Sequence, residues 1–510
     1  MKRAVRNKEQ PSDFLKESDH MGWTKEQRYR RVEDVNQVEL QNLQTRVNEC
    51  TWRQTFHIQP LSGLLNDPNG FSFYHGEYHL FYQWFPLGPV HGLKYWYHTK
   101  SKDLVSWENA GIGIAPDDYY DSHGAYSGSA IEYEGKLYLF YTGNTRDENW
   151  QRHPYQCIAI MEKTGQIEKL THPFIRDVPE GYTNHFRDPK VWRENDTFYA
   201  VIGAQRKDKT GCVVLYRSSN LVNWTFEGEL QTDLGTFGYM WECPDYFELQ
   251  NYGVLMFSPQ GLEPKGDLYH NIYQSGYVIG SKLDTITHSL SHGSFQELDR
   301  GFDFYAPQTM VNPDGRRILV GWMGLPEIDL PTDKNGWAHC LTLPRELSVR
   351  NGKLIQRPVQ ELQALRRQET EVKGVLKNTK NMYEDFKGVS YEMVCEFENN
   401  DAVEFGIEFR AGDDEKTVIK YDTVEKKVIL DRSSSGETVG EAYGTIRKCF
   451  VNTKIIKFHL FVDTSSVEIF INDGEEVFTS RIFPRENRNE IRFFALSGST
   501  TFQAKKWSYV

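Results

Sequence analysis

Residues 74–82 read YHGEYHLFY, and residues 133–141, 59 positions later, read YEGKLYLFY. Each stretch alternates its side chains around a glycine-containing turn, a pattern that is typical of a β-hairpin. Weaker copies lie at residues 193–199, 248–257 and 312–320. Because the hairpins recur at intervals of roughly 60 residues, they predict five blades of a β-propeller around a central axis.

A second repeat lies between the hairpins and keeps the same interval. Residues 101–107 read SKDLVSW and residues 218–224 read SSNLVNW, 117 positions apart. A β-sandwich with unrelated hairpins is the alternative, but unrelated hairpins have no reason to keep matched offsets. We therefore expect an all-β fold whose larger domain is a five-bladed β-propeller at residues 51–345.

The flanks of the propeller differ from it in composition. Residues 1–50 are polar and charged, and their helical composition predicts a short helical N-terminal extension packed on the outside. Residues 346–370 are expected to form a linker that contains a short helix. Residues 371–510 alternate without the repeat and predict a C-terminal β-sandwich. Its expected strands are residues 389–398, 402–410, 417–421, 427–431, 455–462, 466–472 and 491–496.

Composition and charge argue against several classes of function. The formal net charge of −12 does not favour nucleic acids or anionic membranes as partners. The N-terminus has no apolar signal segment, and no apolar run is long enough to span a bilayer. The seven cysteines are scattered without zinc-site spacing, and their odd number favours free thiols in a cytoplasmic protein.

A carboxylate precedes three of the hairpins. Asp67 lies in the stretch LLNDPNG, Asp188 in FRDP and Glu242 in WECPD. A lone Asp-Pro is usually a solvated turn, but turn carboxylates have no reason to recur in front of apolar hairpins. Because equivalent positions of successive blades surround the axis, we expect the three carboxylates to converge in phase on one funnel.

Three carboxylates among aromatic and amide side chains suit a sugar site. Glycosidases need one carboxylate as nucleophile or base and another as acid, with their pKa values pushed apart. Glu242 is expected to be the desolvated acid, Asp67 to be kept ionised by amides at residues 66 and 69–70, and Asp188 to stay anionic beside Arg187. A calcium site is the alternative, but the spacing of an EF-hand loop is absent.

At these three motifs the sequence resembles glycoside hydrolase family 32, the β-fructosidases. The resemblance covers most of the chain, including residues 462–470 (VDTSSVEIF), and implies a five-bladed propeller followed by a β-sandwich. It also implies that Asp67 is the nucleophile, Glu242 the acid/base and Asp188 the transition-state stabiliser. Residues 82–94 (YQWFPLGPVHGLK) are most similar to the bacterial sucrose-6-phosphate hydrolases of the family.

The resemblance further implies a reaction and a set of sugar contacts. The reaction is retaining hydrolysis of the β-fructofuranosidic bond of sucrose 6-phosphate, and of sucrose, through a covalent fructosyl-enzyme. No metal or organic cofactor is implied, and a monomer or homodimer would act on this small sugar in the cytoplasm. The positions that match substrate contacts of the family are Leu64, Leu65, Asn66, Gln83, Tyr126, Ser127, Arg187, Tyr305 and Trp322.

Basic residues near the expected funnel rim are candidates for a phosphate contact. His91 and Lys94 come first, followed by Arg152 and His153, and each is alternatively a solvated loop charge. Three other functions stay open at this point. They are a β-fructosidase for plain sucrose or short fructo-oligosaccharides, an inverting arabinan or xylan hydrolase, and a non-enzymatic carbohydrate-binding propeller.

Overall fold

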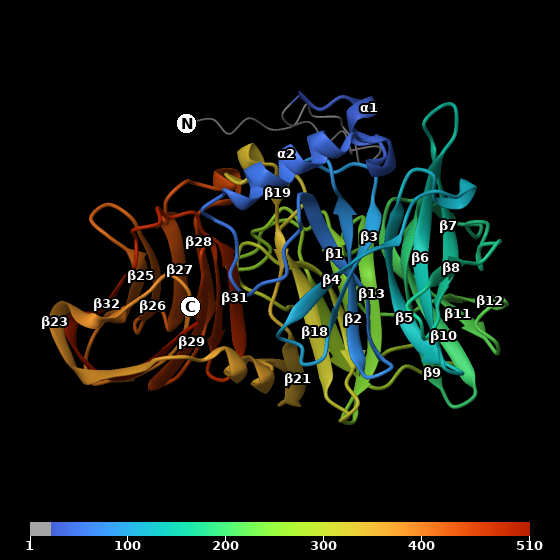
Figure 1. Cartoon of the computed structure of the whole chain (residues 1–510). Helices are drawn as coiled ribbons and strands as arrows, with labels where there is room; N and C mark the ends of the chain where they lie inside the picture. Colours follow the sequence, from blue (N-terminus) through green and yellow to red (C-terminus); the bar gives the residue numbers. More distant parts are fainter. Residues whose placement is uncertain (1–21, 510) are drawn as a thin grey trace, which may run out of the picture.

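The computed structural model describes residues 22–509, whose regular secondary structure is mainly β-sheet (Figure 1). Five of these sheets are the blades of a propeller, and a further sheet folds over itself beside them as a C-terminal sandwich. This confirms the all-β fold with a five-bladed propeller, a β-sandwich and a helical N-terminal extension. The part of the predicted extension before residue 22 lies outside the described residues. Within the described chain, no helix is long and apolar enough to cross a membrane.

The helices are few and short. Two α-helices lie across one end of the propeller in Figure 1, and short 3-10 helices are scattered between strands. The α-helices are α1 (Lys25–Arg28) and α2 (Gln37–Asn48), and the 3-10 helices are η2 (Val32–Asp34), η3 (Tyr119–Asp121), η4 (Asp333–Asn335), η5 (Gln360–Leu365) and η6 (Glu441–Tyr443).

Each blade is an antiparallel sheet, and the first strands of the blades contact one another around the axis. Blade one contains β1 (Gly63–Tyr74), β2 (Glu77–Phe85), β3 (Tyr95–Ser101) and β4 (Trp107–Ile114), and blade two contains β5 (Ala125–Tyr133), β6 (Lys136–Arg146), β7 (Arg152–Met161) and β8 (Ile167–Lys169). Blade three contains β9 (Tyr182–Glu194), β10 (Thr197–Arg206), β11 (Gly211–Ser218) and β12 (Trp224–Glu229), and blade four contains β13 (Met240–Leu249), β14 (Tyr252–Gln260), β15 (Gly276–Gly280) and β16 (Gln296–Glu297). Blade five contains β17 (Tyr305–Val311), β18 (Arg317–Met323), β21 (Arg345–Arg350) and β22 (Lys353–Pro358), with β20 (Cys340–Leu341) beside β18 and β19 (Trp337–Ala338) parallel to β1.

All five predicted hairpins are present as the first two strands of a blade. Their physical basis is a tight turn at which one or two residues take a left-handed conformation, as His75 does at φ 48° and Asn195 at φ 56°. The second repeat is a shared loop between the third and fourth strands. Asp103 and Asn220 occupy the same place in it, and each side chain accepts hydrogen bonds from the backbone N–H groups two and three residues later.

The fifth blade extends beyond the predicted end of the propeller. Strands β21 and β22 pair with each other and with β18, so the sheet continues to Pro358 rather than stopping at residue 345. The sequence did not reveal this, because the long loop after β18 separates the outer strands from the hairpin. The predicted linker contributes only η5 between this blade and the sandwich.

The C-terminal sheet contains every strand that the alternation predicted, and three that it did not. Its strands are β23 (Glu369–Lys387), β24 (Tyr391–Asn399), β25 (Glu404–Ala411), β26 (Lys416–Asp422), β27 (Lys427–Ser434), β28 (Ile446–Phe450), β29 (Ile455–Asp463), β30 (Ser466–Ile471), β31 (Glu476–Arg481) and β32 (Glu490–Ser508). The missed strands are β23, β28 and β31. Strand β23 buries only Leu376 and Phe386 among its 19 residues, so it carries little apolar alternation to detect.

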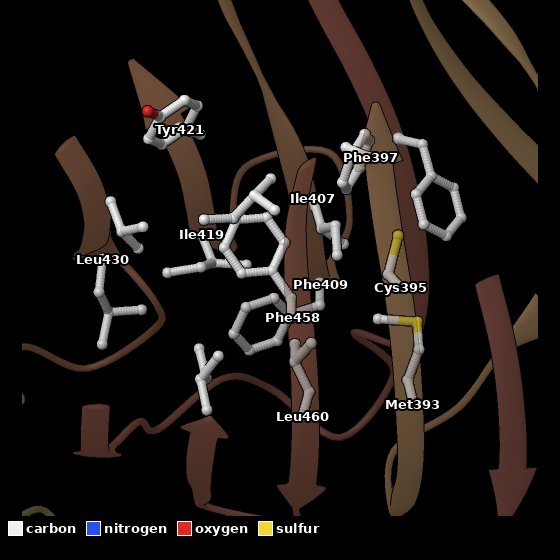
Figure 2. Packing of buried hydrophobic residues seen from close by; sticks show 14 of the residues in the cluster. Met393, Cys395, Phe397, Ile407, Phe409, Ile419, Tyr421, Leu430, Phe458 and Leu460 are labelled. Carbon is white, nitrogen blue, oxygen red and sulfur yellow. The ribbon is translucent and has the colours of Figure 1, made fainter. Parts of the chain in front are cut away.

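One long strand joins the two layers of the sandwich. The first part of β32 pairs with β25 and its second part pairs with β24, and the chain changes layers at Ser497–Gly498 with φ values of 51° and 138°. Figure 2 shows the result, in which side chains such as Phe397, Phe409 and Phe458 pack together from different strands. These side chains are fully buried, so the hydrophobic effect holds the two layers together.

A buried network of charges joins the sandwich to the propeller. Arg345, at the start of β21, donates to Glu468 of β30 at 2.6 Å and to Asp299 of the propeller at 3.1 Å. His57 bridges Glu468 and Asp463 at 3.1 and 2.8 Å. Burial by itself would lower the pKa of His57, but the two carboxylates raise it to about 9. The two domains are therefore held by specific ion pairs as well as by apolar packing.

We expect Arg345→Met to destabilise the protein by about 3–5 kcal/mol, because it leaves buried Asp299 without its cation and Glu468 with His57 alone. The free energy of unfolding from urea denaturation measures the change. Lys454→Met removes the exposed pair with Glu398 and serves as a control, with an expected loss of at most about 1 kcal/mol. Equal stability of the two variants would contradict the importance of the buried network.

Candidate active site

The first strand of every blade carries an irregularity at the same place. Its pairing with the second strand shifts register at residues 66–67, 127, 188–189, 243–244 and 306–307. In a regular strand, successive side chains face opposite sides of the sheet. A bulge inserts an extra residue and re-aims the side chains beside it, so consecutive residues can both face the axis. In blades three to five the residue at the shift has a left-handed φ, as Asp188 does at 69°.

The bulges arrange the site as two rings of side chains around the axis. Each blade contributes two consecutive residues, the first to one ring and the second to the other. We call Asn66, Tyr126, Arg187, Glu242 and Tyr305 the upper ring, and Asp67, Ser127, Asp188, Cys243 and Ala306 the lower ring. A central cavity is lined from all five blades, by four members of the lower ring and by residues that follow it. The carboxylates therefore converge as expected, but the three do not occupy equivalent positions of their blades as predicted. Glu242 is equivalent to Asn66, and Cys243 takes the place equivalent to Asp67 and Asp188.

The side chains of three neighbours surround the carboxylate of Asp67. Ser127 Oγ donates to Asp67 Oδ2 at 2.5 Å, and Asn66 Nδ2 donates to Asp67 Oδ1 at 3.1 Å. Gln83 Nε2 donates to Ser127 Oγ at 2.5 Å and lies 3.5 Å from Asp67 Oδ2. Burial raises the pKa of Asp67, and the hydrogen bond from Ser127 opposes this. The Asn69 side chain does not donate to this carboxylate as expected, because its Nδ2 donates to the main-chain oxygen of Asp67 instead.

Glu242 is held by three donors from three blades. Arg187 donates through Nη2 at 2.6 Å and through Nε at 3.0 Å to Glu242 Oε1. Tyr305 donates to the other oxygen at 2.6 Å, and Gln260 donates to the same oxygen at 2.7 Å. Arg187 also lies beside Asp188, as predicted, at 3.9 Å, but its short contacts are with Glu242 of the next blade.

Asp188 lies at the bottom of the funnel without a strong cation of its own. Its Oδ2 accepts from the backbone N–H of Cys243 at 3.0 Å, whereas the nearest guanidinium nitrogen of Arg187 is 3.9 Å away. Burial raises the pKa of Asp188 to about 7; Arg187 lowers it, and the charges of Glu242 and Asp67 add to the rise. Burial therefore works against the predicted anionic state of Asp188, and the charge of Arg187 favours that state.

Some of the predicted sugar contacts instead pack in the interior. The side chains of Leu64 and Leu65 are buried in hydrophobic clusters, so as side chains they do not line the funnel. Trp322 is also buried and packs edge-on against Tyr305 at 6.0 Å between ring centroids, behind the upper ring. Tyr126, in contrast, is partly exposed and lies on the wall of the funnel.

The basic residues predicted at the rim separate into different environments. Lys94 is buried below the rim and donates to Asn66 Oδ1 at 2.7 Å, so its predicted place at the rim is wrong. Burial lowers the pKa of Lys94 to about 7, and Asp67 opposes the shift. His153 is partly exposed and contacts Asp147 at 3.2 Å. His91 lies beside Trp322 at 6.1 Å, and Arg152 is buried over the ring of Tyr126.

Sequence analysis missed two residues that hold the carboxylates. Gln260 contacts Glu242, and Thr142 Oγ1 accepts a hydrogen bond from the backbone N–H of Asp188 at 2.9 Å. Both lie toward the end of a blade's second strand, as Gln83 does, and this shared position is the signal that could have identified them. Within residues 22–509, no cluster of three or more histidine, cysteine or acidic side chains is arranged to hold a metal ion.

Comparisons with known proteins agree with this architecture. The profile described as Glycosyl hydrolases family 32 N-terminal domain matches residues 57–358, and the one described as Glycosyl hydrolases family 32 C terminal matches residues 361–508. The sucrose-6-phosphate hydrolase of Staphylococcus xylosus is 50% identical over 95% of this chain and 98% of its own. The solved sucrose-6-phosphate hydrolase from Lactobacillus gasseri has a TM-score of 0.89 at 40% identity, covering 95% and 99% of the two chains. A mutant of the Bombyx mori GH32 beta-fructofuranosidase in complex with sucrose has a TM-score of 0.77 at 33% identity, covering 92% and 98%.

The raised pKa of Asp188 predicts a pH-dependent cost in stability. Between about pH 4, where an unfolded aspartate ionises, and about pH 7, the folded state binds more protons, so stability falls as pH rises. We expect Asp188→Asn to raise the free energy of unfolding by about 1–3 kcal/mol at pH 8, with the gain vanishing near pH 4. Urea denaturation at both pH values measures this.

Asp196→Asn is the matched control for this experiment. Asp196 is fully exposed in the β9–β10 turn of the same blade, so its replacement is expected to leave stability unchanged at both pH values. A loss of stability in Asp188→Asn at pH 8 would show that the aspartate is not a destabilising charge in the ligand-free fold.

Proposed function

The chain belongs to glycosyl hydrolase family 32 and is a glycoside hydrolase, and from this premise we propose that it cleaves the β-fructofuranosidic bond of sucrose 6-phosphate, yielding fructose and glucose 6-phosphate. The names of its relatives from Staphylococcus xylosus and Lactobacillus gasseri support this substrate. The observation that carries the proposal is the placement of Asp67 and Glu242 on different blades, each fixed by its own hydrogen bonds and facing one axis.

The two carboxylates divide the reaction between them. Asp67 attacks the anomeric C2 of the fructosyl group while Glu242 protonates the glycosidic oxygen. Glu242 then takes a proton from water, which releases fructose from the covalent fructosyl-enzyme with retention of configuration. The Ser127 hydroxyl and the Asn66 amide orient the attacking oxygens of Asp67. Arg187, Tyr305 and Gln260 orient Glu242 in the same way.

Asp188 has the role of binding sugar hydroxyls next to the reacting carbon. Burial raises the pKa of Asp188 to about 7, and hydroxyl donors of a bound fructosyl unit would favour its ionised form. Interactions that strengthen in the transition state lower the barrier, and a carboxylate beside a developing positive charge is one of these. The cytoplasmic location and the monomeric or homodimeric state stay predictions.

Replacing either reacting carboxylate is expected to abolish turnover. Asp67→Asn and Glu242→Gln each lower kcat on sucrose 6-phosphate by about 10³-fold or more, because one removes the nucleophile and the other the proton donor. Initial rates of fructose release measure the loss. Glu248→Gln, at the far end of the strand that carries Glu242, is the control and keeps wild-type kcat. Normal turnover by Asp67→Asn would overturn the catalytic assignment.

The burial of Lys94 predicts an effect on catalysis rather than on phosphate recognition. Lys94→Met frees the Asn66 amide that touches both Asp67 and Gln83, so we expect kcat/KM to fall by about 10-fold or more on sucrose and sucrose 6-phosphate alike. The ratio of the two kcat/KM values is the measurement. A selective loss on the phosphorylated substrate would instead place the ammonium group against the phosphate.

A further inference from the structure

Two arginines at the funnel end of blade two carry charge that the described chain does not neutralise. Arg146 ends β6 and Arg152 begins β7, and the two are directly paired across these strands. Their exposed fractions are 8% and 9%, yet neither forms an ion pair with a carboxylate of the described residues. The Nε atom of each is buried without a hydrogen-bond partner. Burying an unpaired charge is costly, so a site of this kind calls for an anionic occupant.

The arginines lie above the reacting carboxylates. Thr142, which contacts the backbone of Asp188, is on the same strand as Arg146, and four residues of extended chain place Arg146 roughly 13 Å further along it. The guanidinium of Arg152 lies 5.8 Å from the ring centre of Tyr126 in the upper ring. The backbone of Arg152 is fixed by Asn184, which precedes Asp188 on β9. The two arginines therefore lie above the funnel, on the side formed by blade two.

The N-terminal extension builds the outer wall of this corner. Tyr29 packs against Trp150 at 5.2 Å and against His123 at 5.6 Å between ring centroids. Arg146 donates to the main-chain oxygen of Trp150 at 2.8 Å, and Lys25 of α1 lies over the indole. Figure 1 shows α1 at the same end of the propeller as the ends of these strands. The wall excludes water from the guanidinium groups, which strengthens any ionic contact they make.

The other titratable neighbours supply no anion to this corner. Burial and the nearby cations Arg187, Arg152, Lys209 and Arg146 lower the pKa of His185 to about 2, so it is neutral. Asp147 is satisfied by the backbone N–H groups of residues 149 and 151 and by His153. Glu242 is already paired with Arg187. The net charge of the side chains at this corner is therefore positive, which favours the binding of a dianion.

We propose that Arg146 and Arg152 form the subsite for the phosphate group of the substrate, enclosed by Tyr29 and Trp150. This inference rests on the proposed function and deepens it. Guanidinium groups match phosphate because their planar N–H donors bind two oxygens at once. The glucosyl end of the substrate would extend from Glu242 past Tyr126 toward blade two, so preference for a phosphorylated sugar is decided by this corner rather than by Lys94.

The test is the ratio of kcat/KM on sucrose 6-phosphate to kcat/KM on sucrose. In Arg146→Gln and Arg152→Gln we expect this ratio to fall by about 10²-fold from the wild-type value, because each loses charged hydrogen bonds to the phosphate only. His153→Gln, next to Arg152 but facing Asp147, is the matched control and keeps the wild-type ratio. Thermal denaturation checks that each variant is folded.

Product inhibition gives an independent measurement. Glucose 6-phosphate is expected to inhibit the wild type more strongly than glucose does, and this difference should disappear in both arginine variants. Arg152→Lys keeps a charge without the bidentate fork, so its ratio should lie between those of the wild type and Arg152→Gln.

The outcomes separate the inference from the function on which it rests. A wild type that prefers sucrose 6-phosphate, with variants that keep this preference, overturns the subsite and leaves the function standing. An equal loss on both substrates shows that the arginines only support the fold, and it also overturns the subsite. A wild type without preference for the phosphorylated sugar overturns the proposed substrate and the subsite together.

Discussion

The active site depends on one backbone constraint, the bulge that interrupts the first strand of each blade. A regular strand would send Arg187 and Asp188 to opposite faces of the sheet, and the site would have half its groups. With the bulge, both side chains reach the axial space, where Arg187 contacts Glu242 of the next blade. The left-handed φ at Asp188 is the conformational cost of this arrangement.

Hydrogen bonds between blades keep this strained region rigid. Just below the two rings, Gly128 donates to Asn69 at 2.9 Å and Phe71 donates to Gln308 at 2.9 Å. Lys190 of blade three forms an ion pair with Asp245 of blade four at 3.0 Å. Ser129 donates to the main-chain oxygen of Pro189 at 2.9 Å, and the Thr309 backbone donates to Asp245 at 2.8 Å. Together these contacts link all five blades around the axis, so the carboxylates above them cannot separate without breaking buried polar pairs. A preorganised set of charges is what lowers a barrier without reorganisation during the reaction.

The same burial has a cost in stability. The raised pKa values of Asp67 and Asp188 and the lowered pKa of Lys94 arise first from desolvation, which the neighbouring side chains do not fully offset. A substrate with several hydroxyls and an anionic group would supply the missing partners for these groups and for Arg146 and Arg152. Substrate binding and fold stability are therefore coupled through the buried polar groups that line the funnel.

The sequence by itself determined the blade count, the sandwich and the identity of the three carboxylates, because hairpins and acidic motifs are local and are written in contiguous residues. It did not determine that Cys243 rather than Glu242 is equivalent to Asp67, since a one-residue bulge leaves the spacing of motifs almost unchanged. Nor did it show that Lys94 is buried below the rim whereas Arg152 lies over the ring of Tyr126. The surroundings of these two side chains depend on packing between blades and on α1. Only the tertiary structure decides which charges meet, since partners such as Arg187 and Glu242 lie 55 residues apart and on different blades.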